Sequence, residues 1–146
     1  MITRMLSTGS ASACLVAAAV FSAPALAEAW QPQSESPKWA KVREDLTLSG
    51  DLPSKSWVFM EGLHTPAIRA AEYLAGPART PLGVEFDGAL LLQKKEAVDW
   101  QVRLVRMRAL CNQRRLQRLS AKGVWLDYIG RDDTSAKAQW ICGLAL

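Results

Sequence analysis

The pattern of apolar and polar positions divides the chain into a leader, a short polar stretch and one globular region. Residues 1–27 have Arg4 near their start, continue through an apolar stretch and end in Ala25-Leu26-Ala27. A membrane-spanning helix needs about 20 apolar residues, and an Ala-x-Ala end is typical of a signal-peptide cleavage site. The pattern therefore predicts a secretory signal peptide over residues 1–27, cleaved after Ala27.

The next segment, residues 28–37, is rich in Gln, Pro, Ser and Glu. This composition buries too little apolar surface to order itself, so it predicts a flexible tether. A single globular domain is expected over residues 38–146. At its start, residues 39–48 predict a short amphipathic helix that ends at Ser49-Gly50, and the aromatic and β-branched residues 56–60 favour a strand.

The middle of the chain mixes helical and extended patterns. Residues 66–75 contain good helix formers and are followed by Gly76-Pro77, which predicts a helix that stops there. Residues 81–92 are apolar but contain the turn formers Asp87-Gly88, which favours a hairpin or a bulged strand.

Residues 97–121 fit two periods. As a helix, Val98, Val102, Val105 and Ala109 would line one face. As a strand, Val105, Met107, Ala109 and Cys111 would alternate with Arg106 and Arg108. Periodicity alone leaves both alternatives open.

Two late segments have strand composition. Residues 124–129 are rich in β-branched and aromatic side chains, and a turn follows them. Residues 138–144, which carry Trp140 and Cys142, predict a final strand. The elements together predict an α+β fold: a small antiparallel sheet with one or two short helices and one disulfide.

The positions of the cysteines indicate in which cellular compartment the protein works. The chain has three cysteines, and Cys14 lies inside the predicted signal peptide. The remaining two, Cys111 and Cys142, are expected to form one disulfide, since thiols of exported proteins tend to oxidise. The predicted location is therefore the periplasm or another compartment outside the cytosol, or the medium after secretion.

The segment Cys111-Asn112-Gln113-Arg114-Arg115-Leu116-Gln117-Arg118, followed by Gly123, a predicted strand, Trp140 and Cys142, resembles the surface-adhesin protein E-like domain family. The resemblance covers residues 56–142. It implies a small exported α+β domain on an antiparallel sheet, and it favours strands over residues 97–121. The early strand lacks the Tyr-x-Asp pattern expected of that family.

The residues do not suggest an enzyme. His64 is the sole histidine and has no nucleophile or orienting acid nearby in sequence. One histidine and two distant cysteines do not make a common zinc site, so no metal is expected. The glycines do not form a phosphate-binding loop, so no nucleotide or other cofactor is expected.

A local excess of positive charge stands out instead. Between Lys94 and Lys122 the chain has nine basic residues against only Glu96 and Asp99. Such a segment attracts polyanions, and the planar arginine group suits carboxylate and phosphate. The alternative is that these side chains only keep a sheet face soluble. The polyanion-binding candidates are Arg103, Arg106, Arg108, Arg114, Arg115 and Arg118.

We therefore expect an exported, non-enzymatic binding or adhesion-type module with a basic face for an envelope polyanion or a protein partner. Peripheral membrane contact fits this hypothesis. Nucleic acid is not expected, because export separates the protein from nucleic acid. In addition, the basic residues alternate with aliphatic ones rather than with aromatic stacking platforms. The alternative hypothesis is a structural or assembly factor that docks on a membrane-associated protein complex.

Overall fold

The computed structural model of the chain describes residues 18–19, 29–129 and 133–146. The predicted signal peptide, apart from residues 18–19, and its cleavage site lie outside the described residues. No helix in the described part of the chain is long and apolar enough to span a bilayer.

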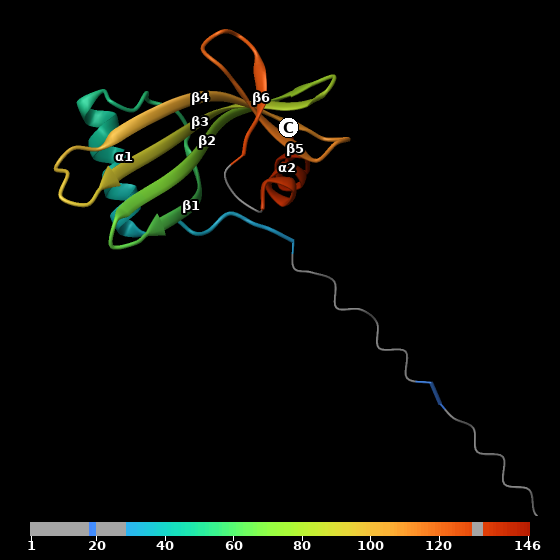
Figure 1. The fold of residues 1–146 in the computed structure, drawn as a ribbon, viewed down its shortest axis with the longest axis horizontal. Helices are drawn as coiled ribbons and strands as arrows, with labels where there is room; N and C mark the ends of the chain where they lie inside the picture. Colours follow the sequence, from blue (N-terminus) through green and yellow to red (C-terminus); the bar gives the residue numbers. More distant parts are fainter. Residues whose placement is uncertain (1–17, 20–28, 130–132) are drawn as a thin grey trace, which may run out of the picture.

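The fold is a six-stranded sheet with one helix on each face (Figure 1). Every strand pairs antiparallel with the next strand in the chain, in the order β1-β2-β3-β4-β5-β6. The elements are α1 (Pro37–Ser49), β1 (Val58–His64), β2 (Ile68–Thr80), β3 (Gly83–Lys94), β4 (Gln101–Leu110), β5 (Arg115–Leu119), β6 (Trp125–Asp127) and α2 (Thr134–Cys142). The predicted α+β class is confirmed.

Helix α1 confirms the helix predicted at residues 39–48. The Ser36 hydroxyl accepts a hydrogen bond from the Trp39 backbone N–H at 3.3 Å, which caps the first turn. Gly50 ends the helix with a φ of 84°, a left-handed conformation that glycine adopts without steric cost. The strand predicted at residues 56–60 is β1, which starts two residues later and runs further.

The helix predicted at residues 66–75 is wrong, because residues 68–75 lie in strand β2. Its alanines are packed on both faces of the sheet: Ala70, Ala71 and Ala75 are all buried between neighbouring strands and side chains. Small side chains suit a central strand that is covered on two faces, and this tertiary demand overrides the helical preference of alanine.

The turn predicted at Asp87-Gly88 is also wrong, because both residues lie inside the continuous strand β3. The irregularity is in the neighbouring strand, where the β2 register shifts between Ala75 and Ala78, opposite Asp87 and Glu85. Gly76 has a φ of 58° there. The irregularity therefore lies in β2, whereas the sequence predicts it within residues 81–92.

Residues 97–121 form β4 and β5, so the strand alternative is confirmed. The strand predicted at residues 124–129 is the short β6. The final strand predicted at residues 138–144 is wrong: residues 134–142 form α2, whose Ala138 and Ile141 lie three positions apart and are buried against the sheet. The spacing suits one face of a helix.

The disulfide between Cys111 and Cys142 is confirmed, with the two Cα atoms 5.7 Å apart. It joins the turn after β4 to the end of α2. Only glycine fits beside this link at position 83, because a Cβ on Gly83 would lie 1.9 Å from the Ala109 carbonyl oxygen and 3.1 Å from Cys111 Sγ. The disulfide therefore holds α2 against one face of the sheet.

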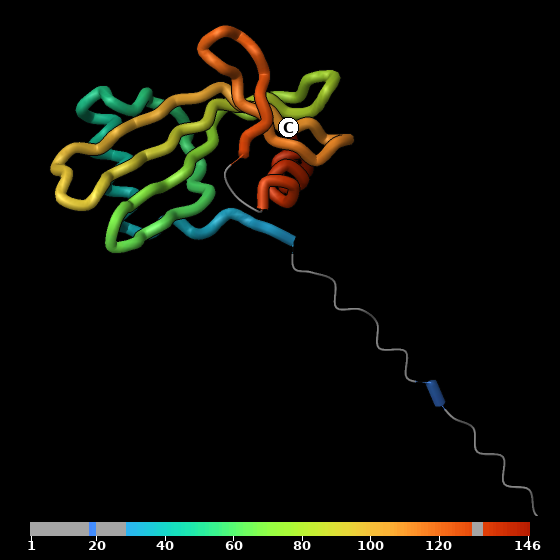
Figure 2. Tube along the Cα trace, viewed as in Figure 1, coloured from blue at the N-terminus to red at the C-terminus, as the bar shows by residue number. Residues whose placement is uncertain are grey.

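Residues 29–36 are not a free tether, contrary to the prediction for residues 28–37. The Gln33 N–H donates to the Met60 carbonyl of edge strand β1 at 2.8 Å, and the Gln33 side chain accepts from Gly62 at 3.0 Å. The Trp30 and Trp140 rings meet edge to face, with centroids 5.7 Å apart. Figure 2 shows this segment passing from α2 towards α1 beside β1. The polar composition misleads because unpaired backbone groups at a sheet edge supply its partners.

Two apolar cores lie on opposite faces of the sheet. The core under α1 includes Leu46, Leu52, Phe59, Tyr73 and Leu91. The core under α2 includes Met60, Leu74, Phe86, Met107 and Ile141. We call these the α1 face and the α2 face.

Candidate functional site

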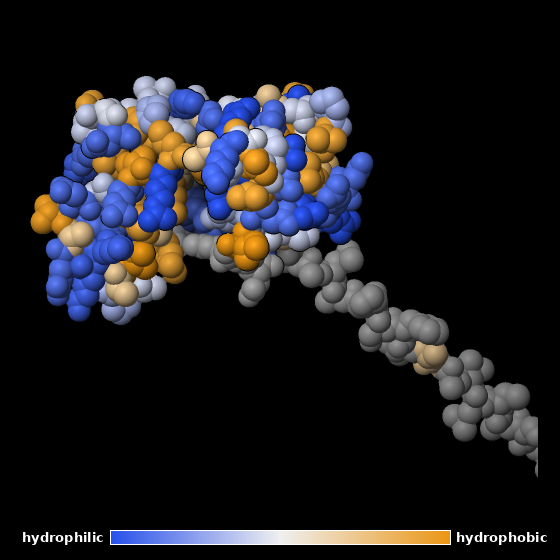
Figure 3. All heavy atoms as spheres, turned by 45° about the horizontal axis from the view of Figure 1, so that its top comes forward, coloured by the Kyte–Doolittle hydropathy of each residue, from blue (hydrophilic) through white to orange (hydrophobic). Residues whose placement is uncertain are grey.

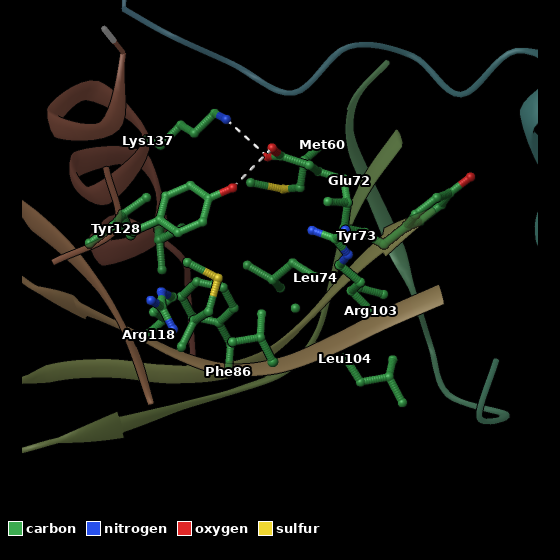
Figure 4. A pocket seen from close by; sticks show the side chains of 17 residues that line it. Met60, Glu72, Tyr73, Leu74, Phe86, Arg103, Leu104, Arg118, Tyr128 and Lys137 are labelled. Atoms are coloured by element: carbon green, nitrogen blue, oxygen red, sulfur yellow. Dashed lines mark hydrogen bonds and ion pairs between the residues drawn. The ribbon is translucent and has the colours of Figure 1, made fainter. Parts of the chain in front are cut away.

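A pocket of about 510 Å³ opens on the α2 face, between the sheet and helix α2. Figure 4 shows its apolar side chains, with Met60, Leu74 and Phe86 between polar groups on either side. In Figure 3 apolar surface borders a hollow in the middle of the molecule, with hydrophilic side chains around it. Pockets that bind small molecules are commonly this large and this apolar.

One side of the pocket carries a buried ionic cluster. Lys137 of α2 is 2% exposed and forms ion pairs with Glu61 of β1 and, at 3.1 Å, with Glu72 of β2. Burial disfavours the Lys137 charge, but the Glu61 hydrogen bond and both carboxylates outweigh it and raise the pKa of Lys137 above its ordinary value. Lys137 therefore stays an ammonium ion at neutral pH, which makes it a poor nucleophile or base.

Two further side chains contact this ionic cluster. The Tyr128 hydroxyl donates to Glu72 at 3.4 Å (Figure 4). The Trp30 ring lies over the Lys137 ammonium, 5.6 Å from nitrogen to ring centroid. The charges of Lys137, Glu61 and Glu72 are thus engaged with one another inside the protein.

The six candidate arginines do not share a face. Side chains alternate along a strand, so in β4 Arg103 points to the α2 face with Val105 and Met107, whereas Arg106 and Arg108 point to the α1 face. In β5 Arg118 lies opposite Met107, on the α2 face, and Arg115 points to the other face. The single basic face predicted from sequence is therefore split by the fold.

Arginines on the α1 face are engaged by neighbouring side chains. Arg106 pairs with Asp87 at 3.0 Å. Arg115 pairs with Asp127. Arg108 donates to Gln117 at 2.8 Å, and its guanidinium carbon lies 4.4 Å from the centroid of Trp125.

Asp87 binds two cations at once, since Lys55 also reaches it at 2.6 Å. Hydrogen bonds from Lys55 and Arg106 hold the pKa of Asp87 below its ordinary value, against the effect of burial. Positive charge on this face is therefore largely balanced by the protein itself.

Arg103 and Arg118 differ, because both line the pocket and are exposed. Among residues 29–129 and 133–146, no carboxylate lies within ion-pair distance of either guanidinium. Arg114 lies in the turn between β4 and β5, has a φ of 51° and is exposed. The geometry thus selects two of the six candidates for the pocket.

Sequence reasoning missed the other pocket residues. The sequence predicts a turn at Gly88 and gives no signal for Lys137, Glu72 and Tyr128, nor for Glu61, which pairs with Lys137 beside the pocket. Lys137 does interrupt the segment Ala136-Lys137-Ala138, but a lysine there is normally solvated, and only the tertiary structure brings the two glutamates to it.

His64 lies exposed at the end of β1, opposite Arg69 of β2, beside a second and smaller hollow of about 200 Å³. In the described part of the chain, no group of three or more His, Cys, Asp or Glu residues is placed to hold a metal ion.

Comparison with protein-family models, curated proteins and solved structures finds no match to this chain. The resemblance to the surface-adhesin protein E-like domain therefore stays a prediction, and the functional argument rests on the pocket itself.

Proposed function

We propose that the protein is an exported, non-enzymatic binding module that holds an anionic ligand on the α2 face of its sheet. The observation that carries this proposal is the pocket of about 510 Å³, where an apolar floor adjoins the guanidinium groups of Arg103 and Arg118. An arginine offers a rigid fork of donors that matches carboxylate or phosphate. A ligand with such a group would occupy donors that the described residues leave open.

Charge at the pocket favours the same conclusion. Lys137 is neutralised by Glu61 and Glu72, so it adds little attraction for an incoming anion. Arg103 and Arg118 are exposed and carry positive charge. Arg118 lies on β5, and Arg103 lies on β4, separated from Glu72 of β2 by Leu90 of β3.

The observed disulfide supports the export part of the proposal. Disulfides persist in oxidising compartments and are rare in the reducing cytosol. The Cys111–Cys142 pair joins two segments of the mature domain. A non-enzymatic role fits the protonated state of Lys137 and the position of His64 outside the pocket lining.

The test is binding of the purified protein to anionic and neutral lipid vesicles and to an acidic polysaccharide, each at low and moderate salt. We expect binding to at least one anionic surface that weakens steeply with salt, because salt screens exposed charges. Replacing both Arg103 and Arg118 by alanine should weaken that binding by about ten- to hundredfold, as expected for a lost charge-assisted hydrogen bond.

The matched control replaces Arg106 and Arg115 by alanine. This variant removes the same net charge from the α1 face, where both arginines are already paired. It should retain most of the binding. Equal losses in the two double variants, or no binding of the wild type to any anion, would overturn the proposal.

A second candidate function is docking on a membrane-associated protein complex. It is favoured by the edge strand β6, which is three residues long and has exposed Leu126 and, just beyond it, exposed Ile129. A stoichiometric partner retained at high salt, lost from a Leu126→Lys variant and kept by the Arg103/Arg118 double variant would support this alternative.

A further inference from the structure

We infer that the ligand is an amphiphile with one aliphatic chain and one anionic headgroup. The chain would lie over Gly88, and the headgroup, a carboxylate or a phosphate, would bind at Arg103 and Arg118. This inference rests on the proposed function and specifies the chemistry of the ligand.

The hollow follows from the register of the sheet. Three rows of side chains cross the α2 face from one strand to the next: Glu72–Leu90–Arg103, then Leu74–Gly88–Val105, then Phe86–Met107–Arg118. The middle row has no side chain at its centre, because Gly88 has no Cβ.

Gly88 thus forms the low point of the floor. A Cβ placed there would lie 3.1 Å from the Met107 sulfur and 3.3 Å from Val105 Cγ1. A side chain there would push Met107 and Val105 aside, so the glycine lets these two pocket-lining side chains lie close to the sheet. A glycine inside a strand otherwise weakens it, since it adds backbone entropy and no packing. At this position the missing side chain contributes to the pocket instead.

The floor accepts an apolar chain rather than a sugar. Its buried side chains are Met60, Leu74, Phe86, Met107, Leu116 and Ile141. Hydroxyl groups of a polysaccharide would lose their bonds to water over such a surface without gaining partners. Methionine side chains adapt to the shape of an apolar ligand, which suits an aliphatic chain.

The charges orient the ligand across the strands. Glu61 and Glu72 lie on β1 and β2, whereas Arg103 and Arg118 lie on β4 and β5. A headgroup is therefore favoured on the β4 and β5 side, where the guanidiniums are exposed to water. The chain then points over β3 towards Leu74 and Met60.

The pocket size limits the ligand to one chain. A volume of about 510 Å³ lies in the range of small-molecule sites. Helix α2 packs on β3, β4 and β5, and its Lys137 and Ile141 line the pocket together with Tyr128, which donates to Glu72. Two long chains side by side exceed this space.

Calorimetric titration with single-chain carboxylates tests the inference. The purified protein is titrated with hexanoate, octanoate, decanoate and dodecanoate below their micelle-forming concentrations, and with alkyl phosphates and neutral alcohols of the same lengths. The dissociation constant should fall about fourfold for each added methylene until the floor is covered. Anionic ligands should bind about tenfold or more tightly than the alcohols.

Variants separate the headgroup from the chain. The Arg103→Ala and Arg118→Ala double variant should lose the preference for anions but keep the dependence on chain length. The Arg106→Ala and Arg115→Ala control should change neither. Val105→Phe, which fills the floor, should flatten the chain-length dependence.

Gly88→Ala provides a second filling variant in case Val105→Phe fails to fold. The nearest atom to its added methyl group is the sulfur of the flexible Met107 side chain, which must shift by a few tenths of an ångström to accommodate it. Thermal unfolding of each variant checks that it is folded.

The outcomes distinguish this inference from the proposed function. If affinity does not depend on chain length, yet a polysaccharide or inorganic phosphate binds through Arg103 and Arg118, the amphiphile is wrong and the proposed function stands. If no anion of any kind binds, both are overturned.

Discussion

The two faces of the sheet bury their apolar side chains in different ways. On the α1 face, Trp39, Phe59, Tyr73 and Trp100 form a chain of ring contacts with centroids 5.3–6.4 Å apart. On the α2 face, an apolar floor stays partly open and forms a pocket. One face buries its aromatic rings in contact with each other, and the other leaves apolar surface that a ligand can cover.

The charges follow the same division. On the α1 face Glu35 binds Arg43 through two hydrogen bonds of 2.8 and 3.1 Å, and the Tyr73 hydroxyl donates to it at 2.8 Å. On the α2 face the ion pairs among the described residues join Lys137 to carboxylates at one end, and neither Arg103 nor Arg118 takes part in them. The comparison shows that a basic stretch of sequence does not by itself form a basic surface, because alternate residues of a strand point to opposite faces of the sheet.

The largest expected effect comes from the buried ionic cluster. Lys137→Met removes the ammonium that Glu61 and Glu72 share inside the α2 face. The free energy of unfolding should fall by about 3–5 kcal/mol, the usual result of breaking a buried pair. Urea unfolding with the disulfide intact measures it.

The control for this prediction is the Lys137→Met and Glu61→Gln double variant. It should recover part of the loss, because it removes a buried negative charge as well. On the α1 face, Arg106→Ala breaks a half-exposed pair and should cost about 1 kcal/mol or less. A similarly small cost for Lys137→Met would contradict the description of the cluster as buried and essential.

Two neighbouring leucines compare the cores directly. Leu91 is fully buried on the α1 face, whereas Leu90 is half-buried in the pocket lining of the α2 face. Leu91→Ala should lower the free energy of unfolding by about 2–5 kcal/mol, because it leaves a cavity in a closed core. Leu90→Ala should cost about 1 kcal/mol, since water already reaches its side.

Chemical denaturation of both alanine variants gives the two values. Their difference is the informative quantity, because the strand and the substitution are the same. Equal costs would mean that the α2 face is as tightly closed as the α1 face, which would argue against an open pocket.

The smallest expected effect concerns acid stability. Hydrogen bonds from Arg43 and Tyr73 hold the pKa of Glu35 below its ordinary value of 4.5, against the effect of burial. A carboxyl with a lowered pKa stabilises the fold above its ordinary pKa, and this contribution is lost as pH falls through the folded value. Glu35→Gln should therefore cost about 1 kcal/mol at neutral pH.

The difference between wild type and Glu35→Gln should shrink as pH falls below 4.5, because the Glu35 carboxyl of the unfolded chain takes up its proton before that of the folded protein. The raised pKa of Lys137 acts in the opposite direction: its contribution is present below its ordinary value of 10.5 and is lost as pH rises through the folded value. The free energy of unfolding, measured from acid to alkaline pH, detects both contributions. A constant difference for Glu35→Gln across acid pH would contradict the ion pair.

Local chemistry was enough for some elements. Helix α1 is bounded by a serine cap and a left-handed glycine, which act within a few residues, and so the sequence located it. Two cysteines outside the predicted signal peptide left one pairing, which the structure confirms. The alternation of Val105, Met107 and Ala109 predicts the strand alternative, which the structure shows as β4.

Long-range packing decided the rest. The alanines of β2 favour a helix locally, but two covered faces require small side chains in a strand. Residues 138–144 have strand composition, yet Ala138 and Ile141 pack as one helical face beside the disulfide. The polar segment around Gln33 becomes ordered because edge strand β1 offers hydrogen bonds that no composition reveals.

The sequence by itself determined the α+β class, helix α1, the disulfide and the positive charge of the middle segment. Only the tertiary structure decided which arginines reach a pocket, that Gly88 lines this pocket, and how Lys137 meets Glu61 and Glu72. The physical reason is that propensity, capping and the single cysteine pairing can be judged from the residues alone. Pairing of charges and open space depend on strand register and on what covers each face, which residues distant in sequence supply.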